Sequence, residues 1–228
     1  MLKRAIIFAN GELCDREKIK TQFDSADFLI AVDGGHRHMK LLGLIPSLVI
    51  GDLDSMQKND VQQLQDAGVE LLRFPSEKNE TDLELALLEA SARGYHSILI
   101  VAGLGGRLDQ TLGNLSLLQA PFLQKCLIKM DDGCVEVWNL KSSNYPEGLQ
   151  IFGEKGEVVS LLAFGSIVKG IMTEGLKYPL SGEDLSPYQT RGISNEMVRS
   201  IAGVSLSEGE LIVIHTRKGK KRFNKLEA

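Results

Sequence analysis

The chain has 228 residues, of which 43% are hydrophobic and 25% charged, so it can form one large globular domain or two modest ones and is not a disordered chain. Its formal net charge of −4 excludes a general attraction to nucleic acid, and its one basic run, residues 217–225, is typical of a solvated chain end. Three scattered cysteines form no CxxC pair, and no apolar run reaches the ~20 residues of a membrane span. We therefore expect a soluble, cytoplasmic protein without a disulfide framework that binds neither nucleic acid nor membranes.

The first 130 residues repeat one pattern, in which a short apolar run, a turn with Gly or Asp and a helical stretch of mixed polarity follow one another. We predict strands at residues 5–9, 28–32, 48–50, 70–74, 97–101 and 127–130. We predict helices between them at residues 15–23, 36–42, 59–67, 82–92 and 108–118. Continuous apolar strands that alternate with helices predict a mostly parallel sheet covered on both faces, which is a Rossmann-like α/β domain.

The pattern changes near residue 140, where Gly, Pro and Ser become more frequent and no long helical period continues. Short strands are predicted at residues 158–163, 167–171, 204–206 and 210–216. This part of the chain is typical of a small all-β sandwich. We therefore expect two domains, residues 1–140 and residues 141–228.

Acidic residues follow successive strands of the first domain. Asp33 follows the second strand, and Asp52 and Asp54 follow the third. Asp82 opens the helix after the fourth strand, and Asp109 comes after the fifth. Because ligands bind beyond the carboxyl ends of the strands in an open α/β sheet, these carboxylates are expected to meet at one edge.

Carboxylates that converge on a crevice repel one another, and a hard divalent cation offsets that cost. Mg²⁺ takes only one or two protein carboxylates and completes its shell with water and phosphate oxygens, so the acids predict a phosphate-bearing substrate, with ATP as the obvious candidate. Asp33 with its two following glycines also fits an ordinary turn, and Thr81 with Glu84 fits a helix capping box. The pair Asp52 and Asp54 is more specific, because a simple turn does not require two acids directly after a buried strand.

The segment Gly105-Gly106-Arg107 combines a permissive backbone with a guanidinium that suits bidentate phosphate contact, which predicts a phosphate clamp. It is neither a Walker A loop nor GxGxxG, so its position after a strand carries the prediction. The chain has no HExxH or GxSxG motif and no Ser-His-Asp order, which excludes zinc-protease and hydrolytic-triad chemistry.

Taken in order, these motifs resemble those of the thiamine pyrophosphokinases, also called thiamine diphosphokinases. The resemblance spans nearly the whole chain. It is carried by the segments Asp33-Gly34-Gly35, Gly51-Asp52-Leu53-Asp54-Ser55, Lys78-Asn79-Glu80-Thr81-Asp82, Gly105-Gly106-Arg107-Leu108-Asp109-Gln110, Gly175-Leu176-Lys177-Tyr178-Pro179-Leu180 and Ser194-Asn195-Glu196.

The resemblance implies an α/β domain that binds Mg-ATP, residues 1–140, and a β-sandwich that binds thiamine, residues 141–228. It implies a cytoplasmic homodimer whose active sites lie between subunits. The family reaction transfers the pyrophosphoryl group of ATP to the thiamine hydroxyl and yields thiamine diphosphate and AMP.

Roles for individual residues follow from the same resemblance. The metal ligands, which also order the triphosphate, are expected to be Asp33, Asp52, Asp54 and Asp82. The catalytic residues are expected to be Asp54, Asp82, Arg107 and Asp109. Nucleotide contacts are expected from Asp33, Gly34, Thr81, Gly105, Gly106, Arg107 and Gln110, and substrate contacts from Lys78, Ser194 and Asn195. Either Asp82 or Asp54 accepts the hydroxyl proton, and the sequence does not choose between them.

Two positions depart from the family pattern. Asn79 stands where Asp is common, which removes a charge next to Glu80, and Gln110 stands where bacterial members often have His, which argues against a general base there. Two alternatives remain open. One is pyrophosphoryl transfer to another hydroxymethyl compound, such as a pterin. The other is a non-catalytic sensor of nucleotide or thiamine diphosphate, which the retention of all four metal-binding acids disfavours.

Overall fold

The computed structural model describes residues 3–54 and 56–219, which divide into two compact units, Met1–Gly133 and Cys134–Ala228. Ser55 of the third-strand motif and residues 220–225 of the basic run lie outside the described residues. Within the described ranges, no helix is both long enough and apolar enough to span a bilayer.

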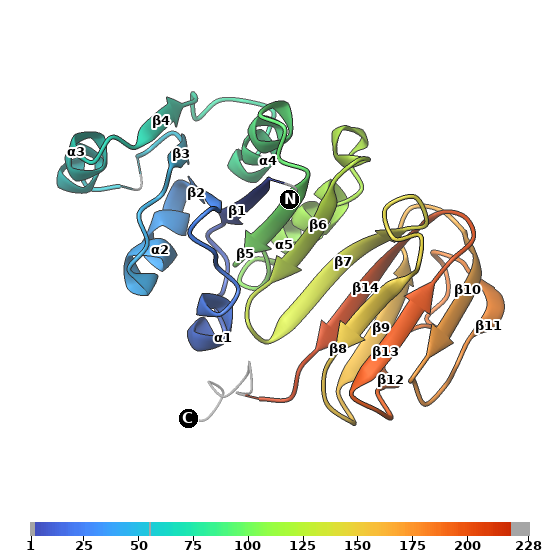
Figure 1. Ribbon diagram of the computed structural model, residues 1–228. Helices are drawn as coiled ribbons and strands as arrows, with labels where there is room; N and C mark the ends of the chain where they lie inside the picture. The colour runs from blue at the N-terminus through green and yellow to red at the C-terminus, as the bar shows by residue number, and fades with distance from the viewer. Residues whose placement is uncertain (1–2, 55, 220–228) are drawn as a thin grey trace, which may run out of the picture. The chain divides into compact units, whose positions relative to one another are not determined.

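The first unit is built on six parallel strands in the order β6-β5-β1-β2-β3-β4 (Figure 1). Their bounds are β1 Arg4–Phe8, β2 Phe28–Val32, β3 Leu48–Gly51, β4 Glu70–Arg73, β5 Ser97–Val101 and β6 Leu127–Asp131. The central strands are apolar and buried along their length, and Ile7 of β1 lies between Ile30 and Ile100. Burial on both faces explains why these strands read as continuous hydrophobic runs.

The helices are α1 Arg16–Lys20, α2 His36–Leu42, α3 Lys58–Asp66, α4 Asp82–Ala92 and α5 Leu108–Leu117, with short 3-10 turns η1 Asp33–Gly35 and η2 Pro121–Leu123. Side chains of α1 and α2, such as Ile19 and Met39, share one core cluster with Phe8 and Val49 of the sheet. Helix α4 contacts β1, β2 and β3 from the other side of the sheet (Figure 1). The predicted Rossmann-like, mostly parallel sheet is therefore confirmed, although α1 is shorter than expected.

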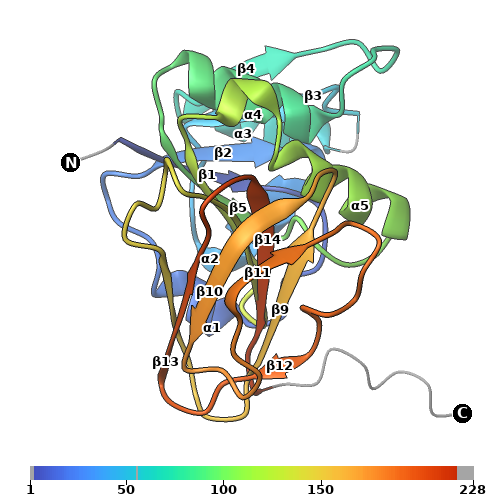
Figure 2. The same ribbon diagram turned by 90° about the vertical axis from the view of Figure 1, so that its right-hand side faces the viewer.

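In the second unit, one set of antiparallel strands has the order β12-β9-β14-β7, and a four-stranded antiparallel sheet has the order β11-β10-β13-β8 (Figure 1). Figure 2 shows strands β9, β10, β11, β13 and β14 from a second direction. Their strands are β7 Val135–Lys141, β8 Leu149–Phe152, β9 Val158–Ala163, β10 Val168–Glu174, β11 Ser181–Leu185, β12 Asn195–Glu196, β13 Ile201–Ser205 and β14 Glu210–Thr216. Side chains from both sheets, including Trp138, Ile151 and Ile171, form one buried cluster. The predicted all-β sandwich is therefore confirmed.

Strands β7, β8, β11 and β12 were not predicted, and β7 shows why. Its sequence, VEVWNLK, carries Glu136, Asn139 and Lys141, yet all three residues are buried. They are buried because each has a partner on β14: Glu210 accepts a hydrogen bond from Asn139 and pairs with Lys141, while His215 contacts Glu136. Paired polar residues thus hide a fully buried strand from a hydrophobicity pattern.

The expectation about cysteines was wrong for two of the three. Cys14 and Cys134 are disulfide-bonded, whereas Cys126 is buried and is not in a disulfide. Sequence spacing alone carries no signal for such a bond, because bonded cysteines need only be close in space.

Candidate active site

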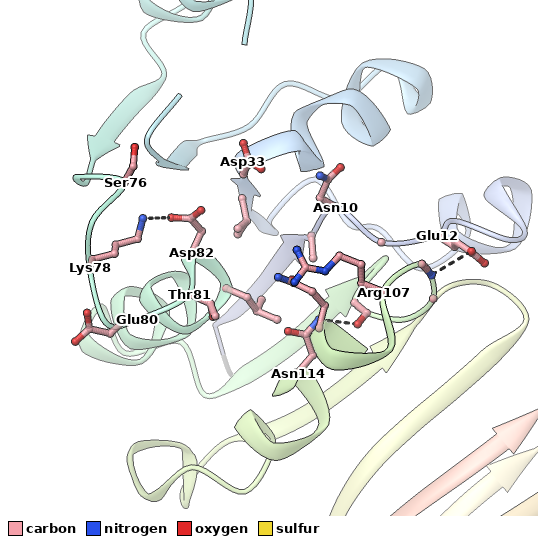
Figure 3. Close-up of a pocket in the computed structure, with 18 residues that line it drawn as sticks. Asn10, Glu12, Asp33, Ser76, Lys78, Glu80, Thr81, Asp82, Arg107 and Asn114 are labelled. Carbon is pink, nitrogen blue, oxygen red and sulfur yellow. Dashed lines mark hydrogen bonds and ion pairs between the residues drawn. The ribbon is translucent and has the colours of Figure 1, made fainter. Parts of the chain in front are cut away.

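A pocket of about 590 Å³ lies at the carboxyl ends of the strands in the first unit (Figure 3). A volume of this size suits a nucleotide-sized ligand. Eight of the predicted site residues line it: Asp33, Lys78, Thr81, Asp82, Gly105, Gly106, Arg107 and Gln110. The remaining predicted residues of the first unit, Gly34, Asp52, Asp54 and Asp109, are not part of the lining.

The loops after β1 and β5 are joined by backbone hydrogen bonds. The N–H of Gly11 donates to the carbonyl of Ala102 at 2.7 Å, and the N–H of Glu12 donates to that of Leu104 at 2.8 Å. A Cβ atom on Gly11 would come within 2.4 Å of the Leu104 carbonyl oxygen, so this approach requires glycine. The two loops therefore form one fixed wall of the pocket.

The glycines after Asp33 also permit close backbone contacts. A Cβ atom at Gly35 would lie 1.9 Å from the carbonyl oxygen of Phe8, and one at Gly34 would lie 2.4 Å from Oδ1 of Asn10. Gly34 is buried and leaves room for the Asn10 side chain, so both Asn10 and Asp33 can line the pocket. The Asp-Gly-Gly segment is thus more than an exposed turn.

Backbone strain gathers at the strand ends. Four residues other than glycine have positive φ angles in the described part of the chain: Asp33 at 44°, Leu53 at 62°, Ala102 at 55° and Ser194 at 61°. Asp33, Leu53 and Ala102 follow β2, β3 and β5, and Ser194 precedes β12. Because such conformations cost about 1–2 kcal/mol each, they persist where the surrounding structure or function requires them.

Helix α4 presents an ion pair to the pocket. Thr81 caps the helix by accepting a hydrogen bond from the Glu84 N–H at 3.2 Å, which places Asp82 in its first turn. Nζ of Lys78 lies 2.9 Å from Oδ1 of Asp82, and both side chains are largely shielded from solvent. The capping box and the predicted site are therefore parts of the same element.

Arg107 and Asp109 form a second pair at the start of α5. The guanidinium donates to both carboxylate oxygens of Asp109, and both side chains are mostly exposed. This bidentate contact lowers the pKa of Asp109 below its ordinary value. Arg107 lines the pocket and Asp109 does not, so Asp109 contacts the site through Arg107.

Asp52 and Asp54 lie beside the pocket. Oδ1 of Asp52 accepts the Asp54 N–H at 3.0 Å, and Oδ2 accepts the hydroxyl of Ser76, a lining residue, at 3.0 Å. These two hydrogen bonds lower the pKa of Asp52. The predicted convergence of all four metal-binding acids is not seen, because only Asp33 and Asp82 line the cavity.

The donor set of the pocket suits magnesium bound partly by a ligand. Among the described residues, no three His, Cys, Asp or Glu side chains are placed to hold a metal ion by themselves. Carboxylates of Glu12, Asp33, Glu80 and Asp82 nevertheless line one cavity. Because Mg²⁺ prefers oxygen and needs only one or two protein carboxylates when phosphates supply the rest, the residues fit this ion.

Ser194 and Asn195 lie in the second unit, before and on β12. The side chain of Asn195 is buried and already occupied: it donates to the Tyr178 carbonyl at 2.7 Å and accepts the Tyr178 N–H at 3.0 Å. Ser194 is exposed, and its N–H donates to the hydroxyl of Ser160. Asn195 therefore holds the exposed Tyr178 in place.

Sequence reasoning missed part of the pocket. The lining also includes Asn10, Glu12, Ser76, Glu80 and Asn114. Asn10 and Glu12 directly follow β1, so the rule that directed attention to the ends of the later strands also applies to them. Asn114 lies in the second turn of α5 and donates to the Gly103 carbonyl at 2.7 Å, a tertiary contact without a local sequence signal.

Each of the two units matches a family model. Residues 19–130 match the family model described as thiamin pyrophosphokinase, catalytic domain. Residues 138–211 match the one described as thiamin pyrophosphokinase, vitamin B1 binding domain.

The chain is 29% identical over 193 residues to thiamine pyrophosphokinase of Bacillus subtilis (strain 168), covering 85% of this chain and 89% of that one. A crystal structure of thiamine pyrophosphokinase from Bacillus subtilis superposes with a TM-score of 0.80 at 26% identity, over 95% of this chain and 100% of that one. One of thiamin pyrophosphokinase from Geobacillus thermodenitrificans gives 0.71 at 26%, over 96% and 98%. Yeast thiamin pyrophosphokinase, at 15% identity and a TM-score of 0.69 over 94% and 86%, shares the fold.

Proposed function

We propose that the two units of this chain, which belongs to the thiamine pyrophosphokinase family, bind different substrates of that family's reaction. The enzyme is a transferase that forms thiamine diphosphate from thiamine and ATP. In our proposal the α/β unit, Met1–Gly133, binds Mg-ATP, and the β-sandwich unit, Cys134–Ala228, binds thiamine. The observation that carries this assignment is the pocket at the strand ends, which combines carboxylates, two cationic side chains and glycine backbone.

The proposed ATP site uses the two sides of this pocket differently. Asp33 and Asp82 hold Mg²⁺, and Asp52 and Asp54 complete the acidic rim beside Ser76. Gly34 shapes the backbone next to Asp33, and the other proposed nucleotide contacts are Thr81, Gly105, Gly106, Arg107 and Gln110. When bound, Mg²⁺ neutralises phosphate charge and orders the triphosphate.

Phosphoryl chemistry of this kind depends on position and electrostatics. The thiamine hydroxyl oxygen forms a bond to the β-phosphorus of ATP while the bond from that phosphorus to the α-phosphate oxygen breaks and AMP leaves. Arg107 and Lys78 offset the negative charge of the transferred group, and Asp109 orients Arg107. The hydroxyl proton passes to a carboxylate, Asp82 or Asp54.

The proposed thiamine contacts lie near β12. Ser194 is exposed and held at a positive φ angle, which suits a residue whose position matters for a ligand. Asn195 supports the same surface by fixing the backbone of Tyr178. We also propose a cytoplasmic homodimer with active sites composed from both subunits, and light scattering of the purified protein tests whether it is a dimer.

The deciding experiment measures nucleotide release from Mg-ATP with and without thiamine, with AMP separated from ADP by chromatography. We expect AMP that depends on thiamine. ADP would indicate an ordinary kinase, and AMP formed only with a hydroxymethyl pterin would indicate another acceptor. Ligand-induced thermal stabilisation without product would support a sensor. Each of these three results contradicts the proposal.

A further inference from the structure

We infer that the Glu12 carboxylate occupies the position at the Gly105–Gly106 turn where a phosphate of the nucleotide binds, and that this phosphate must displace it. The inference rests on the proposed function, because it assigns a specificity-determining residue to the proposed ATP site. Oε1 of Glu12 accepts a hydrogen bond from the Gly106 N–H at 3.1 Å, across 94 positions of sequence. Figure 3 shows Glu12 on the side of the pocket opposite Lys78 and Asp82.

The turn and the carboxylate fit each other closely. Gly105 and Gly106 both have positive φ angles, 82° and 68°. A Cβ atom at Gly105 would lie 2.7 Å from Cδ of Glu12, so the carboxylate rests directly against the backbone of the turn. A Cβ atom at Gly106 would meet nothing within 4 Å. The Gly106 N–H therefore points at a carboxylate, and a phosphate oxygen is another anionic acceptor that such a glycine turn can bind.

The same carboxylate is able to leave without a backbone rearrangement. The N–H groups of Gly11 and Glu12 are bound to the carbonyls of Ala102 and Leu104, so the main chain at this position is fixed. The Glu12 residue itself is exposed. A rotation about its side-chain bonds thus exchanges a protein carboxylate for a ligand anion while the wall of the pocket stays in place.

The cations of the pocket are occupied in a similar way. Lys78 is paired with Asp82, and Arg107 is paired with Asp109. Three donors suited to phosphate are thus each bound to a carboxylate of the chain. The Glu12 contact differs from the other two because its donor is a backbone N–H of the glycine turn itself. Its displacement therefore opens this turn to a phosphate oxygen.

The test compares Glu12→Gln with the wild type and with a matched control, Glu80→Gln. Glutamine keeps the length and the acceptor oxygen of Glu12 but removes its charge. Glu80 lines the same pocket and loses the same charge in the control, without a contact to Gly106. Calorimetry measures binding of inorganic tripolyphosphate and of Mg-ATP to each protein, and steady-state kinetics measures KM and kcat.

We expect Glu12→Gln to bind both probes about threefold to tenfold more tightly, since a charged acceptor at an exposed site contributes this much at most. KM for Mg-ATP should fall in the same proportion. Glu80→Gln should tighten binding by less than Glu12→Gln, because it removes the same charge from the pocket without freeing the Gly106 N–H. Equal tightening in both variants, unchanged or weaker binding in Glu12→Gln, or no binding of either probe by any of the proteins overturns the inference.

A second measurement uses the wild type and does not depend on a variant that folds. The NMR signals of the Gly106 amide and the Glu12 carboxyl carbon are followed as tripolyphosphate is added. We expect the carboxyl signal to move to that of a solvent-exposed glutamate, and an unchanged signal at saturation contradicts displacement. Because tripolyphosphate binding needs no thiamine, a failure of the proposed reaction shows in AMP release alone and remains distinguishable from a failure of this inference.

Discussion

An ion pair of the first unit and a group of ionisable side chains in the second differ in how far they are exposed to solvent. Beside the pocket, Arg107 and Asp109 form an exposed pair, with side chains 72% and 66% exposed. In the sandwich, the ring of His215 is fully buried between two carboxylates, with Nδ1 3.1 Å from Glu136 and Nε2 2.8 Å from Glu157. Exposed pairs exchange partners at low cost, whereas buried pairs do not, because separation leaves a charge without solvation.

His215, Glu136 and Glu157 form one buried group of hydrogen-bonded side chains. Both ring nitrogens of His215 lie within hydrogen-bond distance of carboxylate oxygens. Burial raises the pKa of Glu157, but N–H donation from Glu154 and Lys218, together with His215, outweighs it and leaves the pKa below its ordinary value. Arg217 pairs with Glu136 as well. The second unit therefore uses charge to fix β7, β14 and the start of β9 together.

The largest expected effect comes from breaking this buried group. We expect His215→Ala to lower the free energy of unfolding by about 3–5 kcal/mol, because it leaves buried carboxylates without their partner. Glu208→Gln is the matched control in the same unit, since Glu208 pairs with Lys169 in solvent and should contribute less than about 0.5 kcal/mol. Urea denaturation measures both. Equal losses would contradict the distinction between buried and exposed charge.

The second effect concerns an exchangeable charge of the pocket. We expect Asp82→Asn to lower turnover at least about 100-fold, because it removes a proposed metal ligand and a candidate proton acceptor. The same variant should lose less stability than His215→Ala, since its ion pair with Lys78 is partly exposed whereas His215 is fully buried. Thiamine-dependent AMP release gives the rate. Turnover within about threefold of the wild type would exclude Asp82 from the chemistry.

A backbone change should affect both properties of the first unit. Gly35→Ala places a methyl group 1.9 Å from the Phe8 carbonyl oxygen, so β1 and the turn after β2 must separate. We expect a loss of about 1–3 kcal/mol of stability together with weaker ATP binding, because Asp33 moves with the turn. Gly43→Ala is a useful comparison: its Cβ meets nothing within 4 Å, and only the positive φ angle of 71° opposes it.

The smallest effect is a shift in one carboxylate. The N–H of Asp54 and the hydroxyl of Ser76 lower the pKa of Asp52, so the folded state gains from the ionised form. This gain is present above the ordinary Asp value near ~4 and is lost as the pH falls through the lower folded pKa. Ser76→Ala should raise the Asp52 pKa toward its ordinary value, which an NMR titration of the carboxyl carbon measures. A pKa that stays in place would assign the shift to the Asp54 N–H and the charge of Lys78 instead.

The same contrast explains what the sequence predicts well. The strands and helices of the first unit follow from apolar runs and turn residues, because each βα step is local. Eight predicted residues meet in one pocket because parallel strands all end at the same edge. Asp52 and Asp54 stay outside its lining, since the hydrogen bonds to Ser76 and Asp54 decide where the Asp52 carboxylate turns.

The second unit is harder to predict because its strands depend on partners distant in sequence. The polar residues of β7 make sense only beside β14, about 70 residues later along the chain, where His215 lies opposite Glu136. The role of Asn195 is equally hidden, because its amide acts on Tyr178, 17 positions away. Periodicity within one segment carries no information about such pairs.

The positive φ angles at the ends of β2, β3 and β5 have a consequence for directed evolution of this enzyme. Positions held in an unfavourable conformation are where a selection for heat resistance alone gains most, since residues that accept the left-handed region relieve the tension. A selection that also demands product formation should leave the same positions unchanged. The sites where the two selected populations diverge would then trace the outline of the pocket from genetic data alone.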